Sequence, residues 1–128
     1  MDLRTVAVSM RLLERWGPHG DEPFEAHVRD ALITRPLPQL EAVFSFGRDR
    51  RRGRESAILL TAVGRYRAQY SLIEQMASRL APLAMQYDLL PLIRPIRSAD
   101  FAGMTANTRF VRQLTNDSRM LYWAEAAQ

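Results

Sequence analysis

The sequence contains no cysteine and no lysine, and each absence removes a class of chemistry. Without cysteine, disulfides and thiolate metal sites are excluded, which fits a protein of a reducing compartment. Because all 18 basic residues are arginine, a lysine-based phosphate loop, a Schiff-base lysine and a lysine general base are excluded as well. Any contact with phosphate must then come from guanidinium groups, backbone amides or helix N-termini.

Long apolar runs are also lacking, since none approaches the ~20 residues that a membrane-spanning helix needs. The N-terminal MDLRTVAVSMRLLERWG mixes charged and apolar residues and lacks the layout of a signal peptide. We therefore predict a cytoplasmic protein without membrane association. A length of 128 residues with 47% apolar and 25% charged residues is typical of one compact globular domain.

The spacing of apolar residues and the positions of proline predict the secondary structure. The expected helices are residues 2–15, 22–33, 66–86, 108–115 and 118–126, with a further helix start at 98–101. The expected strands are residues 41–46, 56–63 and 89–96. Pro82 should kink or interrupt the long helix. Pro91 and Pro95 should make the third strand an edge strand or a short central piece.

This order of elements predicts an α/β fold, or α+β in looser terms, with a small mixed sheet and helices packed on it. Residues 1–36 are expected to form an N-terminal helical extension that covers the sheet or mediates assembly. Residues 37–128 are expected to hold the sheet, within a single compact domain overall. Because a small sheet with an exposed edge needs covering, an oligomer is also expected.

The most informative stretch is residues 40–62, in which two apolar runs flank an arginine-rich turn bounded by glycines. Guanidinium groups at this density indicate a site for an anion, such as a nucleotide, a nucleic acid or an acidic partner. The alternative is a solvated turn whose charge resists aggregation. The residues predicted to bind the anion are Gly47, Arg48, Arg50, Arg51, Arg52, Gly53 and Arg54.

Two further arginines and the two histidines are also candidate site residues. Arg65 opens the predicted long helix and either extends the basic surface or belongs to a cluster on the helix surface. Arg94 would point toward the same cleft if the third strand neighbours the second. His19 and His27 lie on different elements without thiols nearby, so no metal site is predicted.

Two short motifs resemble those of a known protein family. They are Val43-Phe44-Ser45-Phe46-Gly47 and Glu55-Ser56-Ala57-Ile58-Leu59-Leu60. Over about residues 38–123 the chain resembles the minimal nucleotidyltransferases of the polymerase-β-like superfamily. In that family a strand ends in a glycine turn, and the next strand carries two aspartates. The resemblance implies a nucleotidyltransferase-like sheet, and small members of the family are often paired with a helical partner in toxin–antitoxin modules.

The chain departs from this family where the chemistry would lie. The family's turn serine falls at Arg48, its two aspartates fall near Ser56 and Ile58, and its third acid falls at Leu90 or Leu92. Carboxylates hold the two Mg²⁺ ions of that reaction, and these side chains cannot replace them. The resemblance therefore implies a degenerate member with no catalytic residue, no metal ligand and no cofactor.

The function predicted from the sequence is that of a non-catalytic, antitoxin-like regulatory protein that binds a partner through its arginine-rich loop. A protein partner or a second copy is expected, and a nucleotide or nucleic acid is a candidate ligand. One alternative is a nucleic-acid-binding module. The other is an active Mg²⁺-dependent nucleotidyltransferase, which would depend on Glu55.

Overall fold

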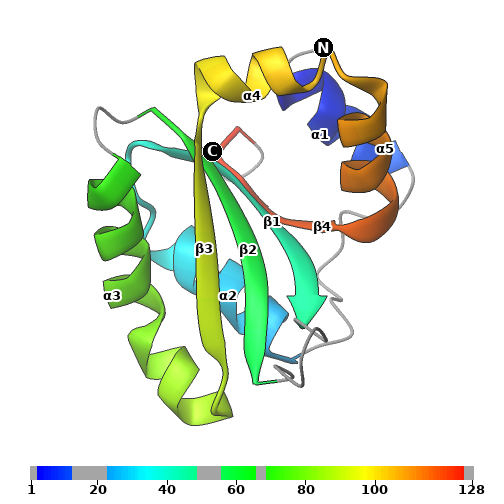
Figure 1. Cartoon of the computed structure of the whole chain (residues 1–128). Helices are drawn as coiled ribbons and strands as arrows, with labels where there is room; N and C mark the ends of the chain where they lie inside the picture. Colours follow the sequence, from blue (N-terminus) through cyan, green and yellow to red (C-terminus); the bar gives the residue numbers. More distant parts are fainter. Residues whose placement is uncertain (1–2, 13–22, 49–55, 66–68, 126–128) are drawn as a thin grey trace.

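The chain folds as helices packed on one four-stranded sheet (Figure 1). The structure, a computed structural model, describes residues 3–12, 23–48, 56–65 and 69–125. The helices in these ranges are α1 (Leu3–Leu12), α2 (Pro23–Thr34), α3 (Gln69–Tyr87), α4 (Ser98–Met104) and α5 (Thr108–Asp117). The strands are β1 (Leu40–Arg48), β2 (Ala57–Gly64), β3 (Leu90–Arg97) and β4 (Arg119–Trp123).

The sheet is mixed, with the strand order β3-β2-β1-β4. β1 runs antiparallel to both β2 and β4, whereas β2 and β3 are parallel and are connected through α3. A parallel pair needs such a crossover, because a tight turn can join only antiparallel strands. The α+β class and the mixed sheet predicted from the sequence are confirmed.

The prediction of a helix over residues 118–126 is wrong, because Arg119–Trp123 forms strand β4 on the edge of the sheet beside β1. The register shifts between Val43 and Phe44, so the apolar residues of β4 do not simply alternate between the faces. Met120 and Trp123 enter one core, while Leu121 and Tyr122 enter the other. Burial raises the pKa of the Tyr122 phenol above its usual value.

Each face of the sheet carries its own core. On one face, α2 contributes Phe24 and Leu32, and α3 contributes Leu72 and Met76. On the other face, α1, α4 and α5 supply side chains that include Val6, Phe101 and Leu114. We call these the α2/α3 face and the α1/α4/α5 face. The two N-terminal helices α1 and α2 thus lie on opposite faces of the sheet.

The prolines of the later elements occupy positions that the backbone tolerates. Pro82 lies inside α3, which nevertheless continues to Tyr87 without interruption. β3 is an edge strand, as its two prolines indicated. The Leu90 amide donates to the Ser56 carbonyl at 2.8 Å. Because N–H groups alternate sides along a strand, Pro91 and Pro95 occupy positions that face away from β2.

Candidate functional site

The predicted anion site begins at the end of β1, where Gly47 still pairs with Leu59 of β2. Gly47 has a φ of 78°, and its amide donates to the Ser45 hydroxyl oxygen at 3.1 Å. A register shift between Ser45 and Gly47 marks a bulge at the same point. Arg48 follows as the exposed last residue of β1, opposite Ile58. The other predicted site residues, Arg50, Arg51, Arg52, Gly53 and Arg54, lie outside the described residues.

Replacing Gly47 with alanine is expected to lower the free energy of unfolding by about 1–2 kcal/mol, because a left-handed backbone is costly for a residue with a Cβ atom. A Cβ atom at Gly47 would meet nothing within 4 Å, so the backbone alone sets the effect. Urea denaturation followed by circular dichroism measures it. The matched control is Gly103→Ala in α4, where space is equally open and alanine should be neutral or stabilising. Equal effects at Gly47 and Gly103 would contradict the conclusion that Gly47 requires a left-handed backbone conformation.

Next to the end of β1, part of the α1/α4/α5 face is hollowed and only partly covered. The hollow has a volume of about 350 Å³. It is lined by Phe46, Leu59, Leu60, Thr61, Leu92, Arg94 and Gln113. The guanidinium carbon of Arg94 lies 5.8 Å from the centre of the Phe46 ring, a cation–π arrangement. β3 does neighbour β2, as the prediction for Arg94 required, and Arg94 lies over the residue that precedes Gly47.

The strand register shows which positions share this face. Leu59 pairs with Leu92 across the parallel strands, and both line the hollow. Ile58 points the other way and is fully buried in the core under α2 and α3. Ser56 and Ile58, where the family resemblance places its two aspartates, therefore do not share a face with Leu90 and Leu92. The β2 positions that do share that face are Ala57, Leu59 and Thr61.

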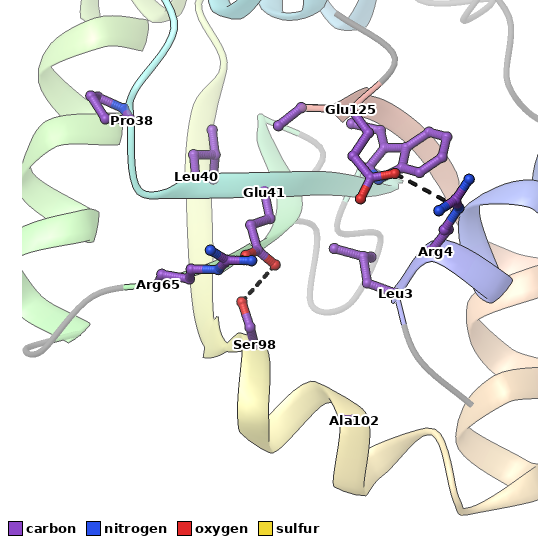
Figure 2. A pocket seen from close by; sticks show the side chains of 11 residues that line it. Leu3, Arg4, Pro38, Leu40, Glu41, Arg65, Ser98, Ala102 and Glu125 are labelled. Carbon is purple, nitrogen blue, oxygen red and sulfur yellow. Dashed lines mark hydrogen bonds and ion pairs between the residues drawn. The ribbon is translucent and has the colours of Figure 1, made fainter. Parts of the chain in front are cut away.

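A larger pocket of about 750 Å³ lies at the opposite end of the sheet, beyond the carboxyl ends of β2 and β3. Its polar centre is Glu41 at the start of β1 (Figure 2). The Glu41 carboxylate accepts a hydrogen bond from the Ser98 hydroxyl at 2.7 Å and forms an ion pair with Arg65. On the far side of the pocket, Arg4 and Glu125 approach to 3.9 Å.

This polar cluster was not foreseen from the sequence. Arg65 was assigned to the basic surface or to a helix cluster, yet it lies just after β2 and pairs with Glu41. Its amide also donates to the Gln39 carbonyl at 2.7 Å, so both backbone and side chain tie the end of β2 to the start of β1. Ser98 adds the junction of β3 and α4 to the same carboxylate. No local sequence signal links these segments, because the contacts are made only in the assembled sheet.

The histidine side chains show no arrangement of a metal centre in the part of the chain that the structure describes. His27 contacts Tyr87, with ring centres 5.5 Å apart and a hydrogen bond between the phenol and Nδ1. Among the described residues, histidine, aspartate and glutamate do not gather in groups of three or more that could hold a metal ion. His19 lies outside these residues.

Comparisons with protein-family models, with curated proteins and with solved structures found no match to this chain. Among the helices of the described ranges, none combines the length and apolar character that crossing a bilayer requires. The site must therefore be interpreted from its own geometry and charge.

Proposed function

We propose that this protein is a non-catalytic, nucleotidyltransferase-like regulatory protein of the cytoplasm, which binds an anionic group of its partner through the arginine-rich segment. This segment, residues 48–54, holds five arginines in seven positions and joins β1 to β2. Guanidinium groups bind phosphate or carboxylate through paired N–H donors and need no metal ion to do so.

One observation carries the proposal. Beside the end of β1, the sheet face presents Leu59, Leu92 and the guanidinium of Arg94. In a metal-dependent nucleotidyltransferase, carboxylates on the corresponding strands would hold Mg²⁺. The described residues that line this hollow include the Arg94 guanidinium and no carboxylate, which favours direct contact with an anion over binding of a metal ion. The antitoxin-like role extends this proposal through the family resemblance, in which small members act with a protein partner.

Calorimetric titration with ATP and GTP, with and without Mg²⁺, tests the anion site. We expect binding that needs no Mg²⁺ and weakens as salt is raised, because guanidinium–phosphate contacts are screened. The triple variant Arg50→Ala/Arg51→Ala/Arg52→Ala should bind at least about tenfold more weakly, since each charge-assisted hydrogen bond contributes roughly 1.5–3 kcal/mol.

The control variant removes the same charge elsewhere. Arg4, Arg35 and Arg79 lie on α1, just after α2 and on α3, so their triple alanine variant keeps the arginine-rich segment intact. Its affinity should stay within about twofold of the original, because distant exposed charges are largely screened. Equal losses in both variants would show general charge attraction rather than a site. Binding that requires Mg²⁺ and is followed by nucleotide consumption would restore the enzymatic alternative.

A further inference from the structure

An exposed apolar stripe runs from the end of α3 onto the hollowed part of the sheet. It consists of Met85, Leu90, Leu92, Leu59 and Phe46. Met85 is 84% exposed and Leu90 is 61% exposed, and the other three are half-buried. Core packing does not account for the exposure of Met85 and Leu90, so this end of the stripe requires an explanation of its own.

The stripe is continuous from one element to the next. Met85 lies at the end of α3, which packs on the opposite face of the sheet, but it lines a small hollow at the start of β3 together with Leu90, so the stripe passes around this end of the strand. Leu90 and Leu92 are two residues apart on one strand and therefore share a face. Leu92 pairs with Leu59, and both line the second hollow together with Phe46. Contiguous apolar surface of this kind marks an interaction site more often than scattered exposed residues do.

The helices of this face cover its other end. Phe101 of α4 stacks on Phe44 with ring centres 5.9 Å apart, and Leu114 of α5 is fully buried in the same core. The exposed Gln113 of α5 lines the hollow next to the end of β1. The covered and uncovered parts therefore lie on the same strands, and the stripe begins where the packing of α4 and α5 ends.

Positive charge borders the stripe. Arg94 lies over Phe46, and exposed Arg48 is two residues further along β1. The chain then continues into four more arginines before β2, with Asp49 and Glu55 as the acids of that segment. Asp88 is the acid beside Met85 and Leu90. A second copy of this chain would bring like charges together here, whereas an acidic partner would meet charge of opposite sign.

We infer that the stripe docks an amphipathic helix of a partner protein, with an apolar face against the stripe and acidic residues beside Arg94 and Arg48. The inference deepens the proposed function, on which it rests for the anionic character of the partner. Strands lie about 4.8 Å apart, so the three strands of the stripe span roughly 10 Å. This matches the diameter of a helix, which docks through side chains repeating at three and four residues.

A synthetic helical peptide tests the inference without knowledge of the natural partner. The probe carries leucine at helical spacing on one face and glutamate on the other, with a fluorophore at one end. Two matched peptides carry lysine or glutamine in place of glutamate. Fluorescence anisotropy with the whole chain should show binding of the glutamate peptide, weaker binding of the glutamine peptide and none of the lysine peptide.

Variants of the described residues locate the contact. Leu90→Glu and Met85→Glu should each weaken binding of the glutamate peptide at least about tenfold, because each removes an apolar contact and adds a like charge. Arg94→Gln should weaken binding of the glutamate peptide but not of the glutamine peptide. Ile33→Glu on α2 is the matched control, since Ile33 is also an exposed apolar residue, and it should leave binding unchanged.

The possible results separate this inference from the proposed anion site. No binding of the glutamate peptide, or equal binding by Leu90→Glu, would overturn the inference. Sedimentation showing a dimer that Leu90→Glu dissociates would overturn it in favour of a second copy. Leu90-dependent peptide binding without any nucleotide binding would uphold the stripe and contradict only the nucleotide arm of the proposed function.

Discussion

Phe101→Ala is expected to lower the free energy of unfolding by about 3–5 kcal/mol, the range for removing a fully buried aromatic ring. Phe101 is completely buried and contacts two other rings. It stacks on Phe44 at 5.9 Å and meets Phe110 edge-on at 6.0 Å. α4 has only 7 residues, about two turns, so it is too short to be stable alone and depends on this packing for its attachment to the sheet. Urea denaturation of the variant measures the loss.

Tyr70→Ala is the matched control, because Tyr70 is an aromatic residue that is 69% exposed. Its removal should change the free energy of unfolding by less than about 0.5 kcal/mol. Domains of this size are stable by roughly 5–15 kcal/mol, so Phe101→Ala should remove at least about a fifth of the free energy of unfolding. A small and similar effect of both variants would mean that α4 is not anchored through Phe101.

Arg119→Met is expected to destabilise the protein by about 3 kcal/mol, because it removes a cation from beside a buried carboxylate. Glu25 in the first turn of α2 is only 1% exposed, and its Oε1 lies 3.5 Å from Nη1 of Arg119 on β4. The contact joins a helix of the α2/α3 face to the edge strand β4. Thermal and urea denaturation of the variant provide the measurement.

Substituting the other partner of the ion pair, Glu25→Gln, should lower the free energy of unfolding less, by about 1 kcal/mol. The Arg119 side chain is 34% exposed and can turn toward water, whereas Glu25 cannot reach water without moving α2. The double variant Arg119→Met/Glu25→Gln should be more stable than Arg119→Met alone. In the double variant the buried side chain at position 25 is neutral, so the loss of the Arg119 guanidinium costs less. Additive losses in the double variant would show that the two side chains are not coupled.

Much of the fold could be predicted from local patterns. The apolar runs that became β1 and β2, the long amphipathic helix α3 and the prolines of β3 each carry a signal within a few residues. β4 could not be predicted in the same way. Four of its five residues, Met120 to Trp123, are apolar at consecutive positions, and periodicity does not distinguish a short buried strand from a helix segment. Pairing with β1 decides between them, and that pairing is a tertiary contact.

Parts of the candidate site could likewise be predicted from local sequence, whereas other parts depend on tertiary contacts. Gly47 was identified because a glycine after a strand indicates a turn, but the structure places it inside β1 at a bulge, where its φ is positive. The partner of Arg65 was missed because Glu41 lies on another strand, and the pairing depends on strand register. The apolar stripe was missed because exposure depends on where α4 and α5 stop covering the sheet. Sequence patterns describe each element, whereas these features arise between elements.

The two prolines on the outer side of β3 also bear on the behaviour of the protein in concentrated solution. Growth of a cross-β fibre needs an edge on which each incoming strand finds a continuous row of backbone donors. Between Pro91 and Pro95, only Ile93 places an N–H group on the outer side of this strand. The β3 edge therefore cannot act as a template for a further strand, and a chain rich in apolar strands is protected there from indefinite self-association.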